Sequence, residues 1–165
     1  MPTTAQVLAD QMDTSRELTR WYFSKLKETD AYKQFEVDGK KLNNWYWVLA
    51  HITWAEHFLI INGTGGTPLP EFDDLQAFSM GNGYNQSSAK WQVKELMDLF
   101  KKVHAHTMEH LRTLTDEQLA EDNNLGFSFS SDMSKKAIIM HCIRHEGTHT
   151  GHLSLLCKLF EVKTI

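Results

Sequence analysis

The chain of 165 residues contains little proline and little cysteine, and it has no long hydrophobic run. Its three prolines are Pro2, Pro68 and Pro70, so most of the sequence is free of the residue that breaks helices. Long proline-free stretches favour long helices. No stretch approaches the roughly 18 consecutive apolar residues of a membrane-spanning helix, so we expect no membrane partner.

The two cysteines, Cys142 and Cys157, fall in one predicted helix. At about 1.5 Å per residue they would lie roughly 22 Å apart, too far for a disulfide. We therefore expect free thiols and a cytoplasmic protein. The N-terminal residues show no charged segment followed by an apolar run, so no secretory signal is expected.

Charge of either sign is modest, with a formal net charge of −4 and no cluster of basic residues. This balance argues against nucleic acid as a partner. The composition, 41% hydrophobic and 23% charged, is typical of a globular protein. The length suits one domain spanning residues 1–165.

Hydrophobic periodicity predicts four long helices, at about residues 4–28, 43–62, 87–114 and 131–161. Asn43 is the expected N-cap of the second helix, and Thr115 is expected to begin a capping box for a short extra turn. Residues 63–86 hold both internal prolines and most of the glycines, which indicates a long crossover loop. Two pairs of long helices joined by a crossover predict an all-α four-helix bundle.

Histidine is the conspicuous residue, with nine in the chain. His141, His145 and His149 are spaced by four, which places them on one face of a helix with Cβ atoms about 5–6 Å apart. Neighbouring members can share an ion with metal–nitrogen bonds of about 2.0–2.1 Å. The outer two are roughly 12 Å apart along the axis, so one ion would take only part of this ladder.

A third ligand would come from another helix, and His51 is the best candidate because its helical neighbours are apolar. The alternative for a lone inward histidine is a hydrogen-bonded core residue. The histidine ladder expected on a facing helix favours the interpretation of His51 as a metal ligand. Three protein ligands with an exchangeable position are typical of catalytic metal sites.

The other histidines carry competing interpretations. His106 and His110 lie on a mixed polar and apolar stripe, which favours a solvated or half-buried pair over a second metal site. His57 is rotated away from the face of His51. His141 and His152 are candidates to line a cavity beside the metal, and the alternative for both is a partly exposed polar face.

Residues 145–149 also fit H-E-x-x-H, the zinc-protease signature, in which the glutamate is the general base. The extended form of this motif fails, because His152 and Leu155 occupy its glycine and third-histidine positions. The sequence has no strand-rich region to bind an extended peptide. We therefore set the peptidase interpretation aside.

Two segments carry a resemblance to a known family. Residues 45–56, WYWVLAHITWAE, are similar to an apolar segment that ends in histidine, an aromatic and an acidic residue. Residues 141–152, HCIRHEGTHTGH, are similar to the pattern H-x-x-x-H-x-x-x-H-R-G-Q. The chain resembles the DinB family (DinB/YfiT-like metalloenzymes) over nearly its whole length.

This resemblance implies an up-down-down-up four-helix bundle with the crossover between the second and third helices. It maps the metal ligands onto His51, His145 and His149, and it implies zinc or nickel as the metal. Some family members transfer low-molecular-weight thiols such as bacillithiol, mycothiol or glutathione, and homodimers are common. Thr150 and His152 stand where the family often has arginine and glutamine, which weakens the transfer of a particular substrate.

The leading hypothesis is a metal-dependent enzyme acting on a small-molecule substrate, by thiol transfer to an electrophile or by hydrolysis. Trp47, Trp54 and the 63–86 segment are expected to line or cover the pocket, and Glu146 is a candidate to orient water or act as a base. The alternatives are a binding module without turnover and a structural site in a stress-related dimer. Cys142 is the nearby thiol for a closed structural site.

Overall fold

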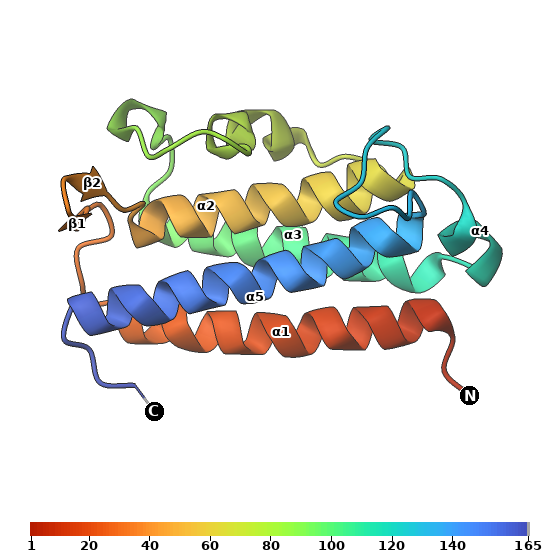
Figure 1. Cartoon of the computed structure of the whole chain (residues 1–165), viewed down its shortest axis with the longest axis horizontal. Helices are drawn as coiled ribbons and strands as arrows, with labels where there is room; N and C mark the ends of the chain where they lie inside the picture. The colour runs from red at the N-terminus through yellow and green to blue at the C-terminus, as the bar shows by residue number, and fades with distance from the viewer. Residues whose placement is uncertain (165) are drawn as a thin grey trace.

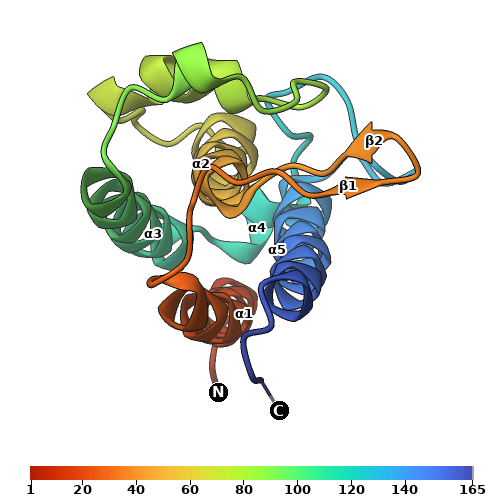
Figure 2. The same ribbon diagram turned by 90° about the vertical axis from the view of Figure 1, so that its left-hand side faces the viewer.

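The computed structural model describes residues 1–164, and they are predominantly helical. Four long helices lie side by side (Figure 1), and the end-on view shows them arranged around a common centre (Figure 2). They are α1 (Thr4–Leu26), α2 (Trp45–Glu56), α3 (Val93–Thr113) and α5 (Lys135–Leu159). The prediction of an all-α chain is confirmed.

Each long helix packs against two others: α1 contacts α3 and α5, and α2 contacts the same two helices. The colour gradient in Figure 1 shows α1 and α5 running in one direction and α2 and α3 in the other. The space between the helices is filled by fully buried side chains such as Met12, Leu49, Phe100 and Ile139. Every residue of α2 is buried, so this helix has no solvent-facing side.

The start of α2 differs from the prediction by one residue. Asn44 is the N-cap, and its side-chain oxygen accepts a hydrogen bond from the Trp47 backbone N–H at 2.9 Å. The neighbouring Asn43 instead accepts from the Tyr84 backbone N–H at 3.0 Å. Asn43 and Asn44 are equally good N-caps by residue type. The contact with the distant Tyr84 occupies Asn43 and leaves Asn44 to cap the helix.

Two other helix starts were predicted too early. Residues Gln86–Ser88 form a separate short 3-10 turn, η3, and α3 begins only after its cap at Gln92. The last helix begins after Ser134, because the hydroxyls of Ser128 and Ser130 bind the Asp132 carbonyl and hold the preceding residues in a loop. The short helix α4 (Asp116–Ala120) confirms the expected turn, with Thr115 in a capping box.

A small hairpin was not predicted. Strands β1 (Glu36–Val37) and β2 (Lys40–Lys41) pair antiparallel between α1 and α2. The turn residues Asp38 and Gly39 have φ of 49° and 74°. Asp-Gly is the dipeptide that such a two-residue turn favours.

The crossover is more ordered than a loop. Residues His57–Asn62 continue α2 as a π-helix, η1, and Pro70–Phe78 form a 3-10 helix, η2. Phe72, Leu75 and Phe78 are buried, and η2 packs against α2. The crossover therefore covers the face of α2 that α3 and α5 leave open (Figure 2). No helix in the described residues is both long and apolar enough to cross a membrane.

Candidate metal centre

Three histidines from two helices converge beneath the crossover. His51 comes from α2, and His145 and His149 come from α5. One potential ligand atom of each lies within 4.8 Å of the others. The Nε2 atoms of His51 and His145 are 3.2 Å apart. The structure thus brings together the three residues that the sequence analysis selected, and it leaves His141 outside the group.

The ring of His51 is held in one orientation. Its Nδ1 lies 2.7 Å from the backbone carbonyl oxygen of Phe78, which can only accept a hydrogen bond. Nδ1 therefore carries the proton, and the lone pair of Nε2 faces His145. Trp47 stacks on the ring with a centroid distance of 4.4 Å, and Trp54 stacks at 5.9 Å. This is the tautomer and the fixed orientation that a metal ligand needs.

The three imidazoles are in the neutral form that binds metal. Burial, together with the neighbouring histidines, lowers the pKa of His145 and of His149 to about 3. Burial also lowers the pKa of His51, against the hydrogen bond to Phe78, which raises it. The Nδ1 of His149 is buried and has no hydrogen-bond partner in the described residues. A set of neutral nitrogen donors with an unpaired buried nitrogen fits a divalent transition ion.

A cavity of about 160 Å³ adjoins the histidines. His51, His145 and His141 line it, together with an apolar wall of Trp54, Ala55, Phe58, Leu59, Met80 and Phe129. Trp54 and His141 therefore occupy the predicted cavity-lining positions. Trp47 and His152 do not line this cavity: Trp47 lies against the His51 ring, and the His152 ring is 6.3 Å from that of His149.

Comparison with known families agrees with this geometry. The family model of the DinB superfamily matches residues 11–153, which include all three histidines. The chain belongs to the DinB superfamily. A search of curated proteins finds no match.

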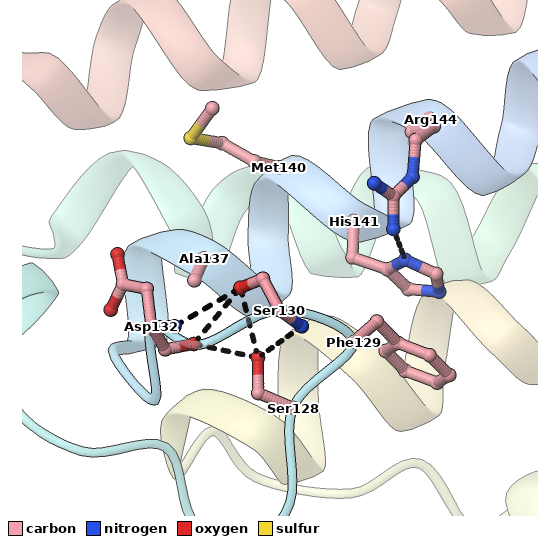
Figure 3. Close-up of a pocket in the computed structure, with 8 residues that line it drawn as sticks. All are labelled: Ser128, Phe129, Ser130, Asp132, Ala137, Met140, His141 and Arg144. Carbon is pink, nitrogen blue, oxygen red and sulfur yellow. Dashed lines mark hydrogen bonds between the residues drawn. The ribbon is translucent and has the colours of Figure 1, made fainter.

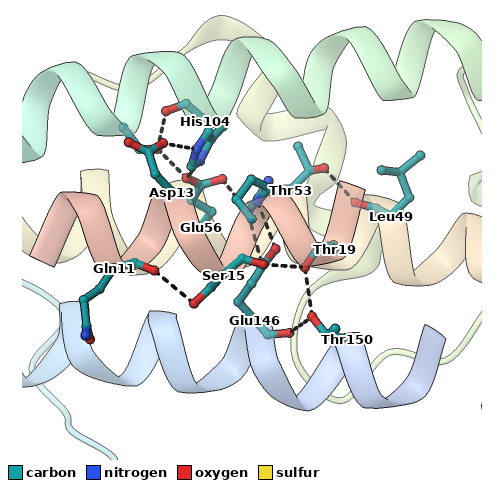
Figure 4. Close-up of polar contacts among 12 residues, drawn as sticks. Gln11, Asp13, Ser15, Thr19, Leu49, Thr53, Glu56, His104, Glu146 and Thr150 are labelled. Atoms are coloured by element: carbon teal, nitrogen blue, oxygen red, sulfur yellow. Dashed lines mark hydrogen bonds and ion pairs between the residues drawn. The ribbon is translucent and has the colours of Figure 1, made fainter. Parts of the chain in front are cut away.

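In this DinB-superfamily chain, Glu146 does not face the histidines beside which the sequence analysis expects it to act as a base or to orient water. Its Oε1 and Oε2 lie 2.9 Å and 3.0 Å from the guanidinium of Arg16 on α1. Arg16 is 0% exposed and Glu146 is 2% exposed. Adjacent residues on a helix point about 100° apart, and here that rotation turns the carboxylate into the helical interior (Figure 4).

Sequence analysis missed the polar network to which Glu146 belongs. Arg16 also pairs with Glu56, at 2.8 Å. His104 lies between two carboxylates, 2.7 Å from Glu56 and 2.8 Å from Asp13 (Figure 4). The available signal was Arg16 itself, because it is four residues after Met12 on the apolar side of α1.

Three other histidines of the DinB chain, His57, His106 and His110, form hydrogen bonds with the crossover. His57 Nε2 accepts a hydrogen bond from the Leu69 backbone N–H at 2.9 Å. His106 Nε2 donates to the Thr67 carbonyl at 2.8 Å, and His110 contacts the Thr64 hydroxyl at 2.7 Å. Within residues 1–164, the trio is the one group of histidine, cysteine or acidic residues with metal-binding geometry.

Cys142 has no part in the histidine group. It is buried, and burial raises the pKa of its thiol well above the ordinary value, with Glu56 and Glu146 raising it further. Its sulfur is not among the donor atoms that converge within 4.8 Å of one another. Among the described residues, the DinB chain therefore offers three donors at this site, without the fourth that a closed structural zinc site uses.

Proposed function

We propose that His51, His145 and His149 bind one divalent transition ion, zinc or nickel, and that the chain is a metal-dependent enzyme acting on small molecules. The observation that carries this proposal is the convergence of three donor atoms within 4.8 Å beside a cavity of about 160 Å³. Three protein donors leave a coordination position for a substrate or water, as in catalytic sites.

The proposed reactions are transfer of a low-molecular-weight thiol to an electrophile, and hydrolysis. A bound divalent ion would supply a Lewis acid that lowers the pKa of water or of a thiol. The protein's own contribution is to hold the donors. The Phe78 carbonyl orients His51, the stacked rings of Trp47 and Trp54 restrict its movement, and the cavity beside it presents a largely apolar wall.

The scaffold we infer is an up-down-down-up four-helix bundle in which α2 and α5 present ligands to one another. Sites in such bundles are built from side chains on facing helices. The buried free thiols Cys142 and Cys157 support a reducing cytoplasmic location. A homodimer is also proposed, and light scattering on the purified protein tests it.

Elemental analysis tests the metal site directly. Protein purified without a metal-chelating column is expected to carry about one zinc or nickel ion per chain. His51→Ala and His145→Ala should each abolish this content, because two imidazoles bind far more weakly than three. His106→Ala removes a histidine that binds the crossover instead, and it should keep the metal. Full metal content in His51→Ala would remove His51 from the site.

Turnover is tested with the metal-loaded protein and a panel of small thiols, each paired with electrophiles, and with activated esters. We expect product only with metal present and none with His145→Ala. Absence of metal-dependent product with every pair would favour the alternative, a site that binds metal and ligand without reaction.

A further inference from the structure

His141 is fixed in one tautomer by a neighbouring arginine. Its Nδ1 lies 2.6 Å from an Nη atom of Arg144 (Figure 3). A guanidinium is always protonated and cannot accept a hydrogen bond, so the ring nitrogen accepts. Phe129 stacks on the same ring, with centroids 3.6 Å apart and planes 9° apart. The proton of the neutral ring is therefore on Nε2, and the plane of the ring is set.

The Nε2–H of His141 is a donor without a protein partner among the described residues, because the hydrogen bond recorded for this side chain uses Nδ1. His141 lines the cavity that adjoins the trio, and its ring centroid is 5.9 Å from that of His145. A donor in this position is within reach of a molecule that also approaches the metal ligands.

The cavity itself indicates the size and kind of ligand. An apolar volume of about 150 Å³ is enough for a benzene ring, and this partly open cavity has a volume of about 160 Å³. Trp54, Phe58 and Phe129 supply aromatic surfaces, which favour another aromatic ring. The protein's own lining residues include no lysine or arginine, so the donor that they offer, the N–H of His141, suits a neutral acceptor such as a carbonyl.

We propose that this cavity binds the aromatic-ring-sized part of a small substrate whose carbonyl-type acceptor takes a hydrogen bond from His141 Nε2–H. Arg144 is a positioning residue, which acts by holding the tautomer of His141. The proposal rests on the proposed function in one respect. The cavity and the His141 donor can bind a ligand without metal, but that ligand is a substrate only because the neighbouring trio holds the ion.

The adjoining pocket of about 340 Å³ on the outer side of His141 is a weaker site for such a ligand. Its serine hydroxyls, from Ser128 and Ser130, already donate to the Asp132 carbonyl (Figure 3). The Asp132 side chain is bound by the Ser134 backbone N–H. Arg144 is thus the one cationic group there, and it is engaged with His141.

Binding of two matched probes tests the cavity and the donor separately. Fluorine NMR is used to titrate 4-fluorobenzamide, which has a carbonyl, and fluorobenzene, which has none, into zinc-loaded and metal-free protein. Wild type should bind both. His141→Phe keeps a ring against Phe129 but loses the N–H, so its affinity for 4-fluorobenzamide should fall about 3- to 10-fold while fluorobenzene is unaffected.

Ala55→Leu places a larger side chain in the cavity and should abolish binding of both probes. Leu59→Phe is a second filling variant in case the first does not fold, as judged by circular dichroism. Lys136→Ala removes an exposed charge elsewhere on α5 and should behave as wild type.

The positioning role of Arg144 is tested separately. Nitrogen-15 spectra of His141 should show a single Nε2–H tautomer in wild type and a tautomer mixture in Arg144→Ala.

Equal binding of 4-fluorobenzamide by wild type and His141→Phe would overturn the role of His141. Absence of probe binding to wild type, or unchanged binding to both filled variants, would overturn the cavity assignment. Zinc content is measured on every sample. Protein that holds zinc but neither probe contradicts this inference alone, whereas protein that holds both probes but no zinc contradicts the proposed function and supports the cavity.

Discussion

The Nδ1 of His51 on α2 lies 2.7 Å from the carbonyl oxygen of Phe78, the last residue of η2. This contact joins a proposed metal ligand to the crossover that covers it. A carbonyl behind a ligand histidine fixes its tautomer and increases its basicity. The crossover is therefore part of the candidate metal centre as well as its cover.

Zinc should stabilise the folded protein, because three donors converge only in the folded state. At a free concentration of about 100 times the dissociation constant, the gain is about 2.7 kcal/mol. For a chain of this size the melting temperature should rise by roughly 5–10 °C. Calorimetry with and without zinc measures the shift. His145→Ala should show little or none, and an undiminished shift in that variant would contradict the assignment.

Loss of the His57 acceptor should loosen the start of the crossover. His57→Phe preserves the stack on Phe72 but leaves the Leu69 N–H without its partner. An unpaired donor costs about 1–3 kcal/mol when fully buried, and Leu69 is half-buried, so we expect a loss near the lower end of this range. Hydrogen exchange at the Leu69 amide should accelerate accordingly. His106→Phe, which affects the Thr67 carbonyl instead, should leave the Leu69 amide protected.

Removal of Arg16 should be strongly destabilising. Arg16→Met leaves the carboxylates of Glu56 and Glu146 buried and uncompensated. Breaking a buried ion pair in this way costs about 3–5 kcal/mol. Urea unfolding measures the loss. Lys94→Met breaks an exposed pair with Asp98 and should leave stability nearly unchanged. A loss in Arg16→Met no larger than in that control would mean that the interior pairs contribute little.

How much of this site the sequence reveals depends on the range of the contacts. The ladder of His145 and His149 is local, since helical spacing alone places both on one face. The inward direction of His51 follows from its apolar neighbours. The convergence of helices that joins Asp13, Arg16 and His104 is not local, and no short pattern encodes it.

Errors in the expected elements have the same origin. The cap of α2 is settled by the bond between Asn43 and Tyr84, which are far apart in the chain. The Asp38–Gly39 turn, by contrast, has a local signal, because Asp-Gly is a dipeptide typical of two-residue hairpin turns. The helix η2 was not predicted because prolines at 68 and 70 are typical of a loop. Pro70 is nevertheless well suited to the first position of a helix, where it stands in η2.

Acid should weaken the fold through Glu56. Burial by itself raises the pKa of this carboxyl, but Arg16, His104 and Thr107 outweigh it and lower the pKa below its ordinary value of 4.5. The unfolded chain then binds the proton more readily than the folded one. The stabilisation is present above about pH 4.5 and is lost as pH falls through the folded pKa.

Unfolding free energies measured between about pH 6 and pH 3.5 check this sign. Glu56→Gln should show a shallower fall than wild type below about pH 4.5. Glu28→Gln alters an exposed carboxyl and should keep the wild-type slope. A wild-type slope in Glu56→Gln would place the acid sensitivity elsewhere.

His145 and Glu146 are neighbours in α5, yet they point in different directions. His145 belongs to the candidate metal-binding group, whereas Glu146 pairs with Arg16. The helix therefore has little freedom to turn about its own axis, since any such rotation would break both sets of contacts at once. A single residue inserted earlier in α5 would rotate both side chains by about 100° relative to the part of the helix that precedes the insertion. The interior charges thus fix the angle at which the proposed metal ligands point, in addition to their effect on stability.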